Sequence, residues 1–64
     1  MEIMTIKELS NYLSISDSEI RKMVRLNVIP FFRLGNRIKF KKSSINKWID
    51  SLEKTETEYN LFYF

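Results

Sequence analysis

Two helix-start motifs, placed close together, constrain the fold of this chain more than any other feature. Thr5 with Glu8, and Ser16 with Glu19, match the capping box, in which a hydroxyl and a carboxylate three residues apart satisfy the first N–H groups of a helix. A second start so soon after the first leaves room only for a short helix, a tight turn and another helix. The sequence therefore predicts helices over about residues 5–13 and 17–26.

Both predicted helices carry one apolar stripe at helical spacing, so each should bury a single face. The stripe of the first is Ile6, Leu9, Tyr12 and Leu13, and that of the second is Ile20, Met23 and Val24. Ile15, just before the second cap, should pack toward Ile20 as a hydrophobic staple. Two short capped helices joined by a tight turn are typical of a helix-turn-helix.

The segment after the second helix predicts a stop and then a β-hairpin. Asn27 suits the left-handed position that ends many helices, and Pro30 prevents the helix from continuing. Beyond them, apolar and basic residues alternate on both sides of Gly35-Asn36, as in two strands joined by a turn.

The alternation assigns the two faces of the hairpin. The apolar inner face is Phe32, Leu34, Ile38 and Phe40, and the cationic outer face is Arg33, Arg37, Lys39 and Lys41. This parity pairs Leu34 with Ile38, whereas a two-residue Gly35-Asn36 loop would pair Leu34 with Arg37. We therefore expect a longer loop that includes Arg37, or a bulge at the tip.

A third helix should follow the hairpin, with Ser43 or Ser44 as its N-cap. Its apolar stripe is Ile45, Trp48, Ile49 and Leu52. Trp48, the single tryptophan, should make the largest apolar contribution to so small a core. The predicted class is α+β: a small winged helix-turn-helix over residues 1–52, with two short helices, a β-hairpin wing and a third helix.

Residues 53–64 differ in character, because an acidic run gives way to aromatic side chains. Four of the nine aromatic residues lie in the last six positions. One reading is that this tail folds back over the core of its own molecule; the other is that it is a self-association segment, giving a homo-oligomer or cooperative binding.

Composition argues against an enzyme. The chain has no histidine, no cysteine and one glycine, so it lacks the commonest general base, thiolate ligands and a phosphate-cradling loop. Glu8 and Glu19 are accounted for by caps, and Asp17 by a first helical turn. We expect no catalysis, no metal and no cofactor. No signal peptide and no membrane span is evident, so the expected location is the cytoplasm.

The positive charge is concentrated in one part of the chain. Nine of the eleven Lys and Arg residues lie between Glu19 and Asp50, a window without any acid. Such a one-sided distribution attracts a polyanion, and double-stranded DNA is the expected partner.

Candidate DNA contacts follow from the helix-turn-helix arrangement, in which the start of the second helix reaches base edges. The candidates for the major groove are Ser16, Asp17, Ser18, Arg21, Lys22 and Arg25, and those of the wing are Arg33, Asn36, Arg37, Lys39 and Lys41. Arg21 can bind guanine through two hydrogen bonds, and Arg37 is the candidate for the minor groove or its rim. Asp17 either accepts from cytosine N4 or stabilises the helix start.

The run Met-Thr-Ile-Lys-Glu-Leu-Ser-Asn-Tyr-Leu-Ser-Ile-Ser (4–16) resembles the opening of excisionase-type, MerR-like winged helix-turn-helix domains. The run Ile-Pro-Phe-Phe-Arg-Leu-Gly-Asn-Arg-Ile-Lys-Phe (29–40) resembles their wing, and the Trp48 segment their closing helix. The resemblance implies a small DNA-binding protein of phages or mobile elements, acting in excision, transcription regulation or DNA packaging. An integrase is a further partner in the excisionase case. Asp17 departs from the basic residue often found there, and Gly35-Asn36 from a common Gly-Gly pair.

Two other functions stay open at this point. A protein-interaction or inhibitor module could use the aromatic tail, with the winged fold as a scaffold. RNA binding is less favoured, because the aromatic residues do not interleave with the basic run as they do in single-strand stacking surfaces.

Overall fold

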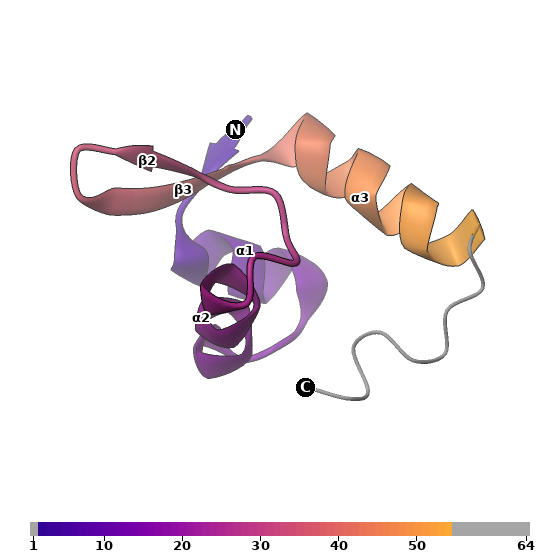
Figure 1. Cartoon of the computed structure of the whole chain (residues 1–64), viewed down its shortest axis with the longest axis horizontal. Coiled ribbons are helices and arrows are strands. Elements are labelled where there is room, and N and C mark those ends of the chain that lie inside the picture. Colours follow the sequence, from indigo (N-terminus) through magenta and orange to yellow (C-terminus); the bar gives the residue numbers. More distant parts are fainter. Residues whose placement is uncertain (1, 55–64) are drawn as a thin grey trace.

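Three helices and a three-stranded antiparallel sheet form residues 2–54, the part of the chain that this computed structural model describes (Figure 1). The elements in order are β1 (Ile3–Met4), α1 (Ile6–Leu13), α2 (Asp17–Arg25), β2 (Phe32–Leu34), β3 (Arg37–Lys41) and α3 (Lys42–Lys54). The strand order is β1-β3-β2, so the second strand of the hairpin is the central strand. The predicted α+β class, a small winged helix-turn-helix with a third helix, is confirmed.

The N-terminal caps of α1 and α2 form where the sequence predicts them. The Thr5 N–H donates to Glu8 Oε1 at 2.9 Å and the Glu8 N–H donates to Thr5 Oγ1 at 3.1 Å, which completes a capping box. Ser16 Oγ accepts from the Glu19 N–H at 3.2 Å. Among the described residues, the second capping box lacks its other bond, from the Ser16 N–H to the Glu19 carboxylate. Ser16 Oγ also lies 3.2 Å from Ser18 Oγ.

The turn between the two helices depends on a serine in a conformation that L residues rarely adopt. Ser14 has φ 60° and lies in the left-handed region. The Ile15 N–H donates to Ser10 O at 3.2 Å, and Ser10 Oγ donates to Ile15 O at 2.6 Å. These bonds hold the turn at Ser14, directly after the last residue of α1. Ile15 is then half-buried against the core that contains Ile20, as the predicted staple requires.

The end of α2 is a Schellman motif. Asn27 has φ 62°, as predicted for the helix stop. Its N–H donates to Val24 O at 3.0 Å, and the Val28 N–H donates to Met23 O at 3.0 Å. These are the two bonds that define the motif, and they satisfy carbonyls that the helix end would leave without donors.

The predicted register of the hairpin is wrong. The pairs in the structure are Phe32 with Lys39, Arg33 with Ile38 and Leu34 with Arg37. The loop is therefore only Gly35-Asn36. Gly35 has φ +67° whereas Asn36 keeps a negative φ, which is the pattern of a type II′ turn, the tight turn that matches strand twist. The turn geometry, and not the alternation of apolar residues, determines the pairing. Leu34 is therefore 60% exposed instead of facing the core.

Strand β1 was not predicted. Ile3 pairs with Lys41 and Met4 with Phe40, so the start of the chain forms the second edge of the sheet. A strand of two residues has no periodicity from which it could be recognised.

The predicted N-cap of α3 is also wrong. The helix begins at Lys42, directly after β3, and Ser43 and Ser44 lie inside its first turn. The Lys42 N–H donates to Glu2 O and Ser43 Oγ donates to Glu2 Oε2, both at 2.7 Å. The segment before β1 therefore contributes to the start of this helix.

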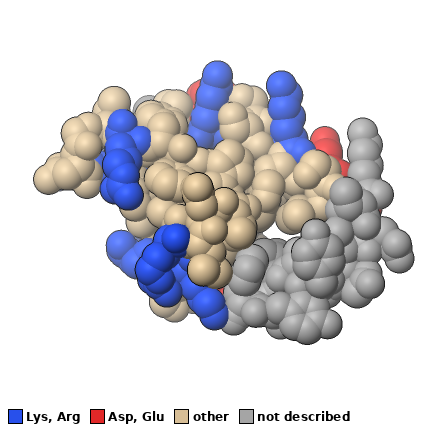
Figure 2. All heavy atoms as spheres, in the orientation of Figure 1, with Lys and Arg blue, Asp and Glu red and all other residues tan. Residues whose placement is uncertain are grey.

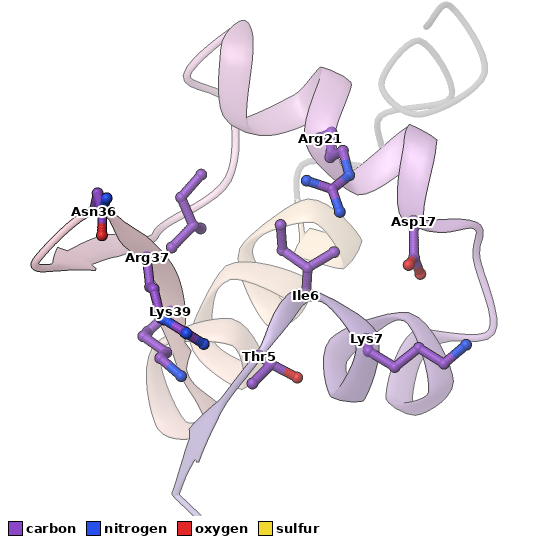
Figure 3. Close-up of a pocket in the computed structure, with 9 residues that line it drawn as sticks. Thr5, Ile6, Lys7, Asp17, Arg21, Asn36, Arg37 and Lys39 are labelled. Carbon is purple, nitrogen blue, oxygen red and sulfur yellow. The ribbon is translucent and has the colours of Figure 1, made fainter.

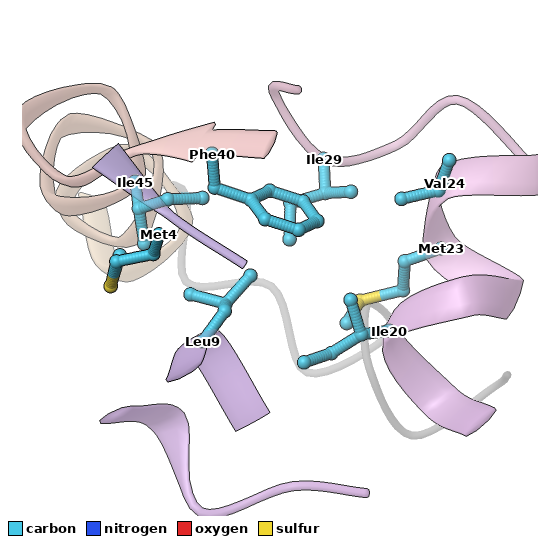
Figure 4. Packing of buried hydrophobic residues seen from close by; sticks show 8 residues of the cluster. All are labelled: Met4, Leu9, Ile20, Met23, Val24, Ile29, Phe40 and Ile45. Atoms are coloured by element: carbon cyan, nitrogen blue, oxygen red, sulfur yellow. The ribbon is translucent and has the colours of Figure 1, made fainter. Parts of the chain in front are cut away.

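The core lies where α1, α2 and α3 meet the inner face of the sheet (Figure 4). Its buried members are Met4, Leu9, Ile20, Met23, Val24, Ile29, Phe40 and Ile45. Phe40, at 0% exposed, is the largest fully buried side chain. Trp48 is partly buried and packs against this cluster rather than among its buried members, and its expected place as the largest apolar contribution stays a prediction.

Tyr12 does not join the core as its stripe position predicts. It is 43% exposed, and its hydroxyl donates to Asn46 Oδ1 at 2.8 Å. The Lys42 ammonium lies 4.9 Å from the centre of its ring. Tyr12 thus connects α1 to α3 across the surface. The aromatic segment considered above, from Tyr59 to Phe64, lies outside the described residues, and its role stays a prediction.

Candidate nucleic-acid interface

Helix α2 buries one face and leaves a polar face exposed. Ile20, Met23 and Val24 are buried against the core. On the remaining surface Arg21 and Arg25 are exposed. The helix therefore presents cationic side chains without losing any packing, as an amphipathic surface helix does.

The predicted residues of α2 differ in their accessibility. Ser16 and Ser18 are exposed, but their hydroxyls lie 3.2 Å apart and Ser16 also caps the helix. Asp17 and Lys22 are half-buried. Asp17 is the first residue of α2, where a carboxylate stabilises the positive end of the helix dipole.

An open concavity of about 370 Å³ lies between the helix pair and the hairpin. Five of the eleven predicted contact residues line it, namely Asp17, Arg21, Asn36, Arg37 and Lys39. They come from segments that are well separated in sequence, the first half of α2 and the turn with β3. The fold therefore brings the two predicted halves of the interface to one surface.

Figure 3 shows how these side chains are arranged around the concavity. Arg21 points from α2 toward Ile6, which lies at the centre. Asn36, Arg37 and Lys39 come from the hairpin on one side, and Asp17 lies on the other. Arginine and lysine groups thus approach the same space from two directions.

Arg33 is the clearest exception among the wing residues. It pairs with Ile38, so it lies on the sheet face opposite to Arg37 and Lys39. Its guanidinium lies 5.7 Å from the centre of the Phe31 ring, a cation–π distance. Lys41 has the parity of Arg37 but lies at the far end of β3, beside β1. The four cations predicted on one face of the hairpin therefore lie on both faces of the sheet, with Arg33 apart from the other three.

Lys7 is a candidate that the sequence did not identify. It is exposed in the first turn of α1 and lines the concavity together with Thr5 and Ile6. Figure 3 shows Lys7 on the same side as Asp17. Lys7 lies outside the basic window of the sequence, and the available signal was its position in the first helix, which crosses the DNA backbone in this motif.

The charge distribution of the surface agrees with this arrangement. Figure 2 shows basic side chains over the hairpin, over α2 and near the start of α3, with few acidic groups on the same face. Within residues 2–54 no group of three or more His, Cys, Asp or Glu side chains could hold a metal ion. No helix in that range is long and apolar enough to cross a membrane.

Comparison with known proteins identifies a family. Residues 3–53 match the family model described as a helix-turn-helix domain, and this match covers α1, α2, the hairpin and nearly all of α3. No curated protein and no solved structure gives a significant match. Because the matched segment is most of the chain and contains the concavity described above, the chain belongs to the helix-turn-helix domain family, which supports DNA as its partner.

Proposed function

We propose that this chain is a sequence-specific double-stranded DNA-binding protein of the excisionase or small transcription-regulator type. In this proposal α2 enters the major groove and the hairpin contacts the minor groove or the backbone beside it. One observation carries the proposal: Arg21 of α2 and Arg37 of the hairpin line the same concavity. A single duplex can be held at both points at once.

The proposed roles differ between the two points. Arg21 forks onto guanine O6 and N7, a contact worth roughly 1–3 kcal/mol of discrimination between bases. Arg37 and Lys39 contact phosphates or the minor-groove rim, and Lys7 contacts phosphate from α1. Phosphate contacts fix the position of the protein without distinguishing sequences.

Asp17 and the two serines have a more structural part in this proposal. Ser16 stabilises the start of α2 through its bond with the Glu19 N–H, and Asp17 stabilises the same end. The carboxylate of Asp17 also keeps phosphates away from the mouth of the concavity. That repulsion favours a binding position in which Arg21 meets a base edge.

The narrower assignment rests on the resemblance of the helix-turn-helix and wing segments to excisionase-type, MerR-like domains. Excision would require an integrase as partner, and regulation would require a promoter site. In both cases the protein acts by binding rather than by catalysis, and its place of action is the compartment that holds the DNA.

The test begins with selection of duplexes from a random pool, because the site is not given in advance. Binding of the selected duplex is then followed by fluorescence anisotropy at several salt concentrations. Arg21→Ala should reduce discrimination against a mutated site by about 5- to 150-fold, the equivalent of one bidentate base contact. Arg37→Ala should weaken all duplexes alike and reduce the salt slope by about 1.

Lys47→Ala is the matched control, since Lys47 is an exposed cation of α3 that does not line the concavity. It removes the same charge from the protein. The proposal is refuted if no duplex is enriched. It is equally refuted if Arg21→Ala and Arg37→Ala behave like Lys47→Ala at every salt concentration.

A further inference from the structure

The outer face of the sheet combines apolar and cationic side chains in a regular way. Each cross-strand pair on that face joins one apolar residue of an edge strand to one cation of β3. The pairs are Ile3 with Lys41, Phe32 with Lys39 and Leu34 with Arg37. Directly opposed residues of antiparallel strands point to the same face, with Cβ atoms about 4.5–5.5 Å apart.

The end of the hairpin is the most exposed apolar part of this pattern. Leu34 is 60% exposed, the highest value among the large exposed hydrophobic residues of the described chain, and Phe32 behind it is 36% exposed. Figure 1 shows the hairpin projecting away from the helices. Figure 2 shows uncharged atoms at the far end of the hairpin, with a basic group just behind them.

The backbone beneath Leu34 is well defined. Leu34 is the last paired residue of β2, and only the two-residue turn separates it from its partner Arg37. Because this backbone is paired and the turn is short, the Leu34 side chain can insert into a partner without a rearrangement of the turn. A surface that contacts Arg37 from the outer face of the sheet also meets Leu34, because the two residues are directly opposed on that face.

We propose that Leu34 is an apolar wedge that enters the minor groove of the bound duplex and opens one base step. The inference rests on the proposed DNA-binding function and adds a specificity-determining residue to it. Aliphatic side chains carried into the minor groove beside cationic ones partly unstack a base step and kink the duplex. Phe32, one pair further back, then packs against the sugars.

The wedge also implies a sequence preference at a position without hydrogen bonds to bases. Pyrimidine–purine steps such as TA and CA/TG unstack at the lowest cost. The binding site should therefore contain such a step where the end of the hairpin lies, in addition to the bases contacted by α2. Replacing that step with a stiffer one weakens binding although no base contact is lost.

The experiment uses the whole chain and the duplex selected above, with 2-aminopurine placed in turn at each pyrimidine–purine step. Binding of the wild-type protein should raise the fluorescence at one step, because an unstacked 2-aminopurine is less quenched. Leu34→Ala should abolish that rise and weaken binding about tenfold, equivalent to burial of one aliphatic side chain. Its salt slope should not change, because no charge is removed.

Two variants make the result specific. Leu26→Ala removes the same atoms from a leucine that is 48% exposed at the end of α2, and it should bind and unstack like the wild type. Leu34→Ile keeps the apolar bulk on a residue that favours strands, and it should retain most of the fluorescence rise. Circular dichroism establishes that each variant is folded.

The outcomes separate the wedge from the proposed function. If Leu34→Ala binds and unstacks like Leu26→Ala while Arg37→Ala still weakens binding, only the wedge is overturned, and the apolar face is then free for a protein partner. If the wild-type chain binds no duplex, the DNA-binding function fails and the wedge fails with it.

Discussion

Replacing Gly35 with alanine should destabilise the protein although the new methyl group touches nothing. An added Cβ at Gly35 would meet no atom within 4 Å, so steric contact with the rest of the fold makes no contribution. The cost comes from φ +67°, in a two-residue turn where only the first position has a positive φ. Such backbone conformations cost an L residue about 1–3 kcal/mol.

Part of this cost is offset in the unfolded state. Alanine restricts the unfolded chain more than glycine does, which contributes about 0.4–1 kcal/mol of stability. The net loss should be about 1–2 kcal/mol. For a domain of this size each kcal/mol lowers the melting temperature by about 4–8 °C. The thermal midpoint, followed by circular dichroism, should therefore fall by at least about 4 °C.

Asn36→Ala is the matched control, because Asn36 occupies the second position of the same turn with a negative φ. Its effect should stay within about 0.5 kcal/mol. A synthetic chain with D-alanine at position 35 should regain the lost stability, since a D residue favours positive φ. Equal small losses for both alanine variants, or failure of D-alanine to restore stability, would contradict the assigned turn.

Two further predictions concern the helix cap and the core. Thr5→Ala should lower the free energy of unfolding by about 1 kcal/mol, because Thr5 Oγ1 would no longer accept from the Glu8 N–H at 3.1 Å; urea unfolding measures this, and Thr5→Ser should recover most of the loss. Phe40→Ala should cost about 3–5 kcal/mol, and more than Trp48→Ala, because Phe40 is 0% exposed and Trp48 only half-buried. The reverse order in urea unfolding by circular dichroism would refute this account of the core.

The features that could be predicted from the sequence are those with local signals. A cap depends on residues three apart, and a helix stop on one residue that tolerates positive φ, so Thr5, Ser16 and Asn27 were identified correctly. Arg21 and Arg37 were predicted as the two contact points from their positions in the helix and at the hairpin tip. The structure brings both to one concavity, while their contact with DNA remains a proposal.

The errors have two physical origins, which are contacts between residues distant in sequence and the geometry of the hairpin turn. The start of α3 was misplaced because Glu2, far from it in the chain, binds Lys42 and Ser43. The face of Phe32 and Leu34 was misassigned because alternation alone gives no information about which face is covered. The geometry of the Gly35-Asn36 turn decided the register against that alternation.

The pairing of β1 with β3 has a consequence for the order of events during synthesis. Ile3 and Met4 leave the ribosome before α1 and α2, but their partners Lys41 and Phe40 are made only after both of these helices. Closing contacts between segments so distant in sequence is the slow part of folding. We expect α1 and α2 to form early, and the sheet to form only when β3 has left the ribosome and can pair with β1.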